Sequence, residues 1–282
     1  MMQALLDDAQ IVYLYDGTLE GMLTAVFEAF RRKEQPRDIV PELGLQQSLL
    51  CSYIPINTNL DLAQRVQTGI INTLSAKTYE SIKQVFLSDD MSKGGVIVSY
   101  LIYTMRKGRG SCSHLAHPAV AAFEELLQVV SHEAHYMLQF VRFAQLDNGV
   151  YFSRITPKAS VIPLIMGHFA ARFNIQPFII YDDIHGMAGV FDTERWWMVD
   201  ARDITVPERT RAEDEFQCLW QTFYDTIAIE ERRNPTCQRN FMPKRFWGNM
   251  CEQIPPELRN IRPKTVTPTA VARQNANRLL ET

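Results

Sequence analysis

Cysteine is scarce in this sequence, and its thiols are not grouped. The chain has 5 cysteines in 282 residues, and no two stand in the CxxC spacing typical of zinc or iron–sulfur ligands. An odd, scattered set argues against the disulfide framework of a small secreted domain, and it predicts no metal site. We expect a reduced, cytoplasmic chain.

Long apolar runs and cofactor motifs are also missing. No run approaches the roughly 20 residues that a helix needs to cross a bilayer, and the first residues, MMQALLDDAQ, lack the basic and apolar regions of a secretory signal. We therefore expect neither membrane insertion nor secretion. The sequence has no phosphate-cradling GxxxxGK[ST] motif and no CxxxCxxC cluster. It thus predicts no cofactor of its own.

Positive charge is not abundant overall. A net charge of −3 and a pI near 6.1 exclude a uniformly basic nucleic-acid coat, so phosphate contacts must come from a local patch. Between Arg232 and Arg245 there is no acidic residue, and we call residues 232–247 the basic segment. Guanidinium groups suit phosphate, amides add hydrogen bonds, and a tryptophan can stack on a base. The predicted nucleic-acid contacts of this segment are Arg232, Arg233, Asn234, Gln238, Arg239, Lys244, Arg245 and Trp247.

The residues before the basic segment allow a second interpretation. Glu230 and Glu231 precede Arg232 and Arg233, so the four side chains can form salt bridges at a helix end without any ligand. This explains only the start of the segment. The preceding helix repeats apolar residues at three- and four-residue intervals, which predicts that its apolar face packs and anchors the basic segment. These residues are Phe216, Leu219, Trp220, Phe223 and Ile227.

The composition is typical of a globular chain with a sizeable core. Hydrophobic residues make up 46% and charged residues 22%. Strand-like runs joined by short turns, with helix-like segments before and after them, predict an α+β fold with an antiparallel or mixed sheet packed against several helices. We predict a single large domain over residues 1–258. From residue 259 to 282 the apolar periodicity is lost, which predicts a mobile tail.

The periodicity also places individual elements. Strands are expected at 11–15, 150–155, 178–182, 188–192 and 196–200, and helices at 19–30, 61–87, 92–105, 119–141 and 160–173. Prolines at positions 36, 41 and 55 predict an extended excursion over the surface between the first two helices.

Three groups of side chains are candidates for chemistry. Asp16, after Tyr15 and before Gly17-Thr18, puts a carboxylate at the mouth of a helix, where capping and function are equally good explanations. His135 and Arg142 lie on a polar stripe of the 119–141 helix, which is alternatively a solvated face. Arg154, His168 and Arg172 lie in or beside the strand–helix region, and the last two, one helical turn apart, could face a common anion or are a surface cation pair. Aspartates near strand ends, at 182, 183, 192 and 200, are expected to serve turns rather than Mg²⁺.

Several motifs in order resemble one known family. They are Tyr15-Asp16-Gly17-Thr18, Phe140-Val141-Arg142-Phe143, Pro163-Leu164-Ile165 with His168-Phe169 and Arg172-Phe173, and Glu231 to Pro235 through Gln238 to Met242-Pro243. The chain is similar, from about Ile11 to Glu252, to bacterial proteins of unknown activity described as probable DNA metabolism or putative DNA repair proteins. The resemblance implies a partner, a radical SAM protein with a helix-hairpin-helix region. Some relatives are fused to a uracil-DNA glycosylase-like domain.

Two functional hypotheses and a third, simpler one follow. In the first, the protein binds DNA as a repair or metabolism factor and acts with the radical SAM partner, with Tyr15, Arg154 and Arg172 adding to the contacts of the basic segment. In the second, it is an enzyme acting on damaged bases, glycosylase- or nuclease-like, with Asp16, His135 and Arg142 as catalytic residues. In the third, it is a scaffold that only binds a protein.

Overall fold

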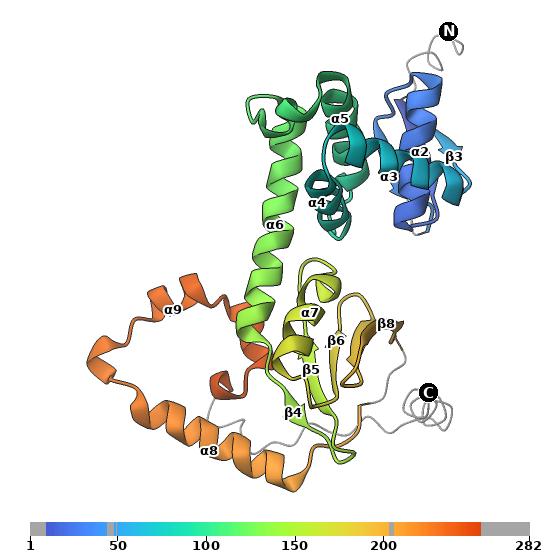
Figure 1. Cartoon of the computed structure of the whole chain (residues 1–282). Coiled ribbons are helices and arrows are strands. Elements are labelled where there is room, and N and C mark those ends of the chain that lie inside the picture. Colours follow the sequence, from blue (N-terminus) through green and yellow to red (C-terminus); the bar gives the residue numbers. More distant parts are fainter. Residues whose placement is uncertain (1–9, 44–47, 49, 203–205, 255–282) are drawn as a thin grey trace. The chain divides into compact units, whose positions relative to one another are not determined.

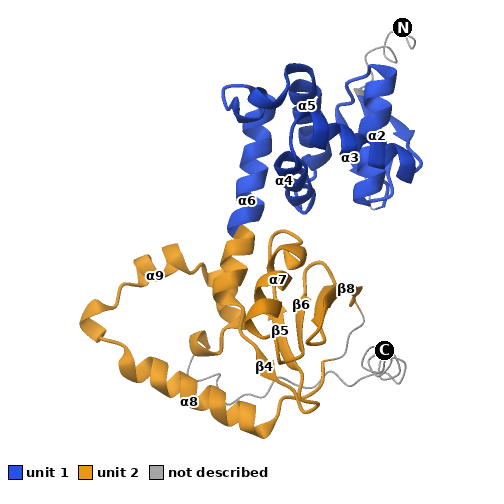
Figure 2. Ribbon diagram, viewed as in Figure 1, with its two compact units in different colours: residues 1–132 blue, residues 133–282 orange. Residues whose placement is uncertain are grey.

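The computed structural model describes residues 10–43, 48, 50–202 and 206–254. Contacts group the chain into two compact units, residues 1–132 and residues 133–282 (Figure 2). The helices, together with one parallel sheet and one mixed sheet, confirm the α+β class. The single domain over 1–258 stays a prediction, and the tail predicted at 259–282 lies outside the described residues.

Unit 1 contains a parallel three-stranded sheet in the order β2-β1-β3. The strands are β1 (Gln10–Tyr15), β2 (Asp38–Pro41) and β3 (Cys51–Pro55) (Figure 1). The central strand β1 was predicted. The surface excursion predicted around the prolines is wrong, because Pro41 and Pro55 end the two edge strands. A proline at a strand end or on an edge need not donate to the sheet, so it does not break the pairing.

The helices of unit 1 follow the predicted periodicity. They are α2 (Leu19–Arg32), α3 (Leu60–Thr73), α4 (Ala76–Phe86), α5 (Lys93–Lys107) and the short 3-10 helix η1 (Arg109–Ser113). The segment predicted at 61–87 is two helices, because the hydroxyl of Ser75 caps α4 and accepts a hydrogen bond from Thr78 N. The core joins Tyr13 and Ile39 of the sheet to Met22, Ile70 and Ile97 of the helices.

One close approach fixes α5 against the sheet. A Cβ atom at Gly94 would overlap the carbonyl oxygen of Ile39 in β2, so only glycine fits at this contact. The neighbouring Gly95 N donates to the Asp38 carboxylate at 2.6 Å. The start of α5 therefore rests directly on the backbone of an edge strand.

Helix α6 (Pro118–Phe140) confirms the helix predicted at 119–141, and the boundary between the units falls within it. In unit 1 its residues Val120 and Phe123 join the core. In unit 2, Glu133 and Met137 are buried.

Unit 2 is built on a mixed five-stranded sheet in the order β4-β5-β6-β7-β8. The strands are β4 (Ala144–Gln145), β5 (Tyr151–Ile155), β6 (Phe178–Asp182), β7 (Met187–Phe191) and β8 (Trp196–Asp200). Only β5 and β6 pair in parallel, and α7 (Ile162–Arg172) makes the crossover between them. The four longer strands and α7 were predicted. The other pairs are antiparallel, as expected for strands joined by short turns.

The described part of unit 2 ends in one longer helix followed by short helical turns. They are α8 (Arg211–Ile227), η2 (Glu230–Arg232), α9 (Pro235–Phe241), η3 (Lys244–Asn249) and η4 (Cys251–Gln253). The apolar face of α8 was expected to pack, but Phe216, Leu219 and Phe223 are exposed. Within the described residues, no helix combines the length and apolarity needed to cross a membrane.

Candidate nucleic-acid interface

The middle of the basic segment is the short helix α9, whose polar residues hold it in place. The side chain of Asn234 caps the helix by accepting a hydrogen bond from Cys237 N at 2.9 Å, and Pro235 occupies the first turn. Gln238 donates to the Gln253 side chain at 3.3 Å. Two of the predicted contacts, Asn234 and Gln238, therefore have structural roles.

Four cations of the basic segment are exposed: Arg232, Arg233, Arg239 and Lys244. Arg233 is 3.3 Å from Glu230, but both side chains are more than two-thirds exposed, so this pair neutralises little charge. Arg239 donates to the hydroxyl of Thr236 at 3.3 Å. Within the described residues, no ion pair involves Arg232, Arg239 or Lys244. The alternative interpretation, salt bridges at a helix end, thus applies to Arg233 and removes little of the positive charge of these four residues.

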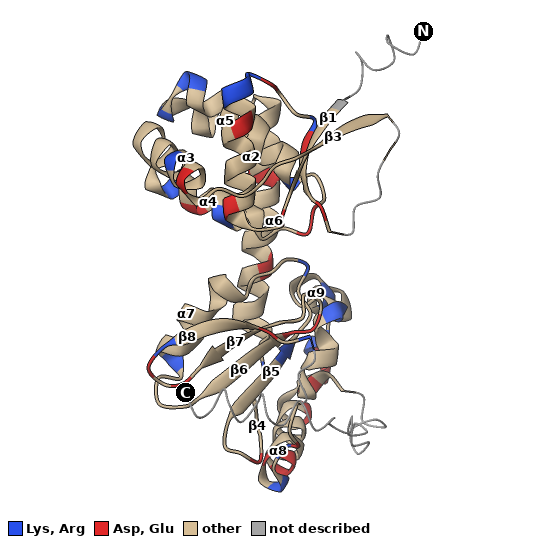
Figure 3. Cartoon of the chain, turned by 90° about the vertical axis from the view of Figure 1, so that its right-hand side faces the viewer, with Lys and Arg blue, Asp and Glu red and all other residues tan. Residues whose placement is uncertain are grey.

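An aromatic ring stands beside these charges. The Lys244 ammonium lies 5.8 Å from the ring centre of Trp247, and the indole N–H of Trp247 donates to the Met242 carbonyl at 3.0 Å. The ring is half-buried and has a fixed orientation. In Figure 3, basic residues mark α9 and its neighbouring turns, whereas acidic residues mark α8. Exposed cations and one oriented indole are features of nucleic-acid surfaces.

Arg245 of the basic segment is used inside the fold. Its Nη1 and Nη2 atoms lie 2.5 Å from Oε1 and Oε2 of Glu133, whose side chain is only 4% exposed. Glu133 also accepts a hydrogen bond from Lys158 N at 2.8 Å. The guanidinium of Arg245 further lies 4.0 Å from the ring centre of Phe246. Its charge is therefore compensated within unit 2.

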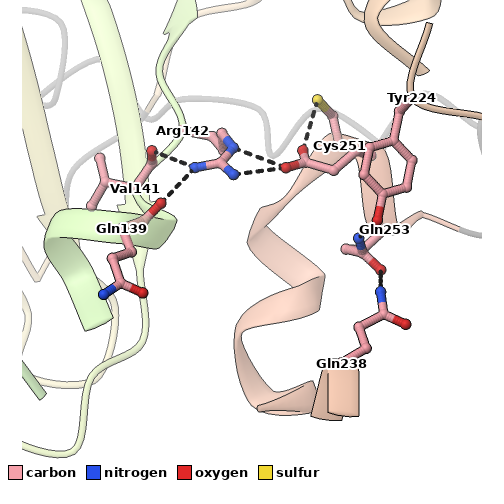
Figure 4. A network of polar contacts seen from close by, with 8 residues as sticks. Gln139, Val141, Arg142, Tyr224, Gln238, Cys251 and Gln253 are labelled. Atoms are coloured by element: carbon pink, nitrogen blue, oxygen red, sulfur yellow. Dashed lines mark hydrogen bonds and ion pairs between the residues drawn. The ribbon is translucent and has the colours of Figure 1, made fainter. Parts of the chain in front are cut away.

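Arg142, predicted to be catalytic, is held in a similar way (Figure 4). Its Nε and Nη2 atoms donate to one oxygen of Glu252, at 3.0 and 2.8 Å, and its Nη1 donates to the carbonyls of Gln139 and Val141. Burial alone would raise the pKa of Glu252, but the hydrogen bonds and charge of Arg142, together with hydrogen bonds from the Glu252 backbone and the Cys251 thiol, outweigh it and hold this pKa below the ordinary value. Arg142 thus fastens the end of α6 to η4.

The same network disfavours the thiolate form of a nearby cysteine. Cys251 lies beside Glu252, and burial together with this negative charge raises the pKa of the thiol to about 11. Gln253 continues the network to the Tyr224 hydroxyl of α8 at 3.0 Å. A thiol that stays protonated is a poor nucleophile. We therefore assign this network a structural role and not a catalytic one.

The other two predicted catalytic residues belong to different units. His135 is exposed on α6, where its Nε2 lies 2.6 Å from the Gln139 amide. Asp16 belongs to unit 1, at the carboxyl end of β1, whereas His135 and Arg142 belong to unit 2. His135 and Arg142 share a neighbour, because both contact Gln139.

Asp16 ties two loops of unit 1 together. Its Oδ1 accepts hydrogen bonds from the backbone and hydroxyl of Thr18, and its Oδ2 accepts one from Thr58, after β3, at 2.7 Å. Burial alone would raise the pKa of Asp16, but these bonds outweigh it and lower the pKa. Thr18 itself caps α2 by accepting from Gly21 N. The capping interpretation is confirmed for this turn, and the carboxylate remains exposed.

The remaining predicted contacts differ in accessibility. The side chain of Tyr15 is buried in the core of unit 1, and burial raises its pKa to about 12. Arg154 is exposed on β5, 3.8 Å from Asp183, and Arg172 is exposed at the end of α7. Three of the four aspartates expected to serve turns do so, since Asp182, Asp192 and Asp200 each accept a bond from a backbone N–H two residues later, whereas Asp183 lies 3.8 Å from Arg154.

Two features of the structure were not predicted. The buried acids Glu133 and Glu252 carry no local signal, because their arginine partners lie 112 and 110 residues away in sequence. Unit 1 also has an apolar pocket of about 190 Å³ between α2, α3 and α5. One cation lines it, Arg65, whose guanidinium lies 5.1 Å from the Phe27 ring centre. The pocket offers no convergent polar groups for catalysis.

Comparisons with known proteins give a family and little more. A family model described as a domain of unknown function, DUF4130, matches residues 91–252. No curated protein matches the sequence. A solved structure described as a DHH domain from a family of ribosomal proteins is similar with 11% identity and a TM-score of 0.24, over 67% of this chain and 74% of that one. A similarity that weak supports no conclusion about fold or function.

Proposed function

Because the chain belongs to the DUF4130 family, whose description assigns no activity, we propose its function from its own surface. The protein binds nucleic acid through the exposed cations of the basic segment, as a factor of DNA repair or DNA metabolism. The contacts are Arg232, Arg233, Arg239 and Lys244, with Trp247 beside them.

The observation that supports this proposal is that some arginines are paired with buried glutamates whereas others are exposed. Arg142 and Arg245 are compensated by buried glutamates, so they serve the fold. Within the described residues, the exposed cations around α9 have no buried acidic partner of this kind. Phosphate is the ligand that such a group of flexible cations attracts, because each contact releases a counterion from the nucleic acid. A half-buried indole at its edge adds a stacking surface for an unpaired base.

The proposal includes a partner. The motif series resembles that of proteins encoded beside a radical SAM protein with a helix-hairpin-helix region, and this chain has no cysteine cluster for such chemistry itself. In this account the partner carries the redox cofactor, and the present chain contributes contacts with DNA. A pull-down of the two purified proteins, with and without an oligonucleotide, tests this part separately.

The binding itself is tested by fluorescence anisotropy with labelled single- and double-stranded oligonucleotides. The double variant Arg232→Ala with Arg239→Ala should weaken binding by at least about tenfold at low salt, as expected for two lost phosphate contacts. Arg195→Ala is the matched control, because Arg195 is an exposed arginine of the same unit, in the turn before β8. Equal affinities for wild type and double variant would overturn the proposed surface.

The enzyme hypothesis keeps its own test. Asp16, His135 and Arg142 stay predicted catalytic residues, but Arg142 is occupied by Glu252. Incubation with uracil-containing, abasic and photodamaged oligonucleotides, with and without Mg²⁺, gives no product in the account proposed here. A product lost in Asp16→Asn would favour the enzyme.

A further inference from the structure

Helix α8 turns its polar side toward its own unit. Glu213 accepts a bond from Gln145 N, the buried Gln221 donates to the Cys251 carbonyl at 2.8 Å, and Tyr224 accepts from Gln253 at 3.0 Å. These positions recur at helical spacing, so they form one side of the helix. A surface helix of a globular protein usually does the reverse and packs its apolar side.

The apolar side of α8 is left exposed. Its residues are Phe216, Leu219, Trp220, Phe223 and Ile227, which lie at three- and four-residue intervals and are between 38% and 69% exposed. The rings of Trp220 and Phe223 contact each other at 5.7 Å between centroids. A continuous aromatic and aliphatic stripe of this kind is typical of a binding surface, not of solvent-facing helix.

We propose that this apolar stripe is the docking surface for the chain's own residues 255–282. The last described element, η4, is fastened to α8 by the contacts of Gln221 and Tyr224, so the described part of the chain ends beside this helix. The 17 residues of α8 are about 25 Å long, a distance that roughly eight residues of extended chain span. The segment is therefore long enough to pass around the helix and follow its apolar side.

The charges of the two segments are complementary. Helix α8 has four acidic residues and one basic residue, whereas residues 255–282 have five basic and two acidic residues. The segment also supplies apolar side chains to meet the stripe, including Ile261, Leu279 and Leu280. A second copy of α8 would instead bring two acidic helices together, which argues against a symmetric helix pair. Composition alone predicted a mobile tail; the surface of α8 gives that segment a place to bind.

The test uses the full chain and hydrogen exchange of the amides in Phe216–Ile227. Docking stabilises the helix, so the variant Ile261→Asp, Leu279→Asp and Leu280→Asp should exchange at least about tenfold faster there, the factor that 1.4 kcal/mol provides. The matched control adds the same three carboxylates without removing an apolar side chain: Thr265→Asp, Thr267→Asp and Thr269→Asp. The amides of Phe216–Ile227 should exchange more slowly in this control than in the variant with aspartate at positions 261, 279 and 280.

Other occupants give different results. If a second copy covers the stripe, exchange in Phe216–Ile227 slows with rising protein concentration, and the variant with aspartate at positions 261, 279 and 280 behaves like the wild type. If only another protein covers it, exchange is the same in wild type and both variants at every concentration. Either result overturns docking of residues 255–282.

Discussion

The side chains of Arg245 and Glu133, which are 112 residues apart in sequence, are joined by two parallel contacts of 2.5 Å. One belongs to η3, and the other lies on α6. A planar guanidinium matches a carboxylate in this way, and the geometry fixes orientation as well as distance. The most basic part of the sequence thus contributes one of its arginines to the fold, and the surface proposed to bind nucleic acid consists of the others.

Glu133→Gln is expected to destabilise the protein by about 3 kcal/mol, because it leaves the Arg245 charge without its partner. The control is Glu230→Gln, which breaks an exposed pair with Arg233 and should cost less than about 1 kcal/mol. Urea unfolding followed by circular dichroism measures both. Similar losses in the two variants would show that Glu133 is not a buried partner.

Arg142→Ala should reduce the sensitivity of stability to acid. The pKa of Glu252 is lowered in the folded protein from an ordinary value of 4.5, so its stabilisation is complete above about pH 4.5 and is lost as the pH falls through the folded pKa. Without Arg142, two of the interactions that lower this pKa are removed while burial still raises it, so less stability should be lost in acid. Unfolding free energies near neutral pH and below pH 4.5 test this. An unchanged acid dependence would contradict it.

Gly94→Ala is expected to destabilise unit 1 by about 1–3 kcal/mol, the usual cost of overpacking. The added methyl group would meet the backbone carbonyl of Ile39, which cannot move without shifting β2. Gly110→Ala, where nothing lies within 4 Å of the added Cβ, is the control and should be nearly neutral. Thermal unfolding distinguishes the two, and equal midpoints would count against the contact.

Thr18→Ala should lower stability by about 1 kcal/mol, because α2 loses the hydroxyl that caps it. Thr18→Ser keeps the hydroxyl and should retain most of the stability. Urea unfolding of both variants provides the measurement. If serine and alanine behave alike, the hydroxyl does not cap the helix.

Elements with a regular local pattern could be predicted from the sequence. Helix α6 and strand β6 follow from their periodicity, since packing one face imposes a fixed spacing, and strand β1 follows from its run of apolar and aromatic residues. The edge strands β2 and β3 were missed because Pro41 and Pro55 were interpreted as breakers, although an edge position tolerates them.

The site was only partly predictable for a related reason. The residue types of the basic segment indicated phosphate contacts, but burial decides which cations remain for a ligand. The acids that remove Arg142 and Arg245 from the surface come from distant parts of the sequence, and no spacing rule connects them. The exposed face of α8 was likewise invisible, because periodicity shows that a helix has an apolar side but not what covers it.

The salt dependence of DNA binding tests the central claim most directly. A plot of the logarithm of the association constant against that of salt concentration has a slope set by the number of phosphates contacted. For Arg232→Ala with Arg239→Ala the slope should fall in magnitude by about 0.7–0.9 for each arginine removed. Arg195→Ala should leave it unchanged. Binding that does not depend on salt, or one slope shared by wild type and the double variant, would contradict a nucleic-acid surface at the basic segment.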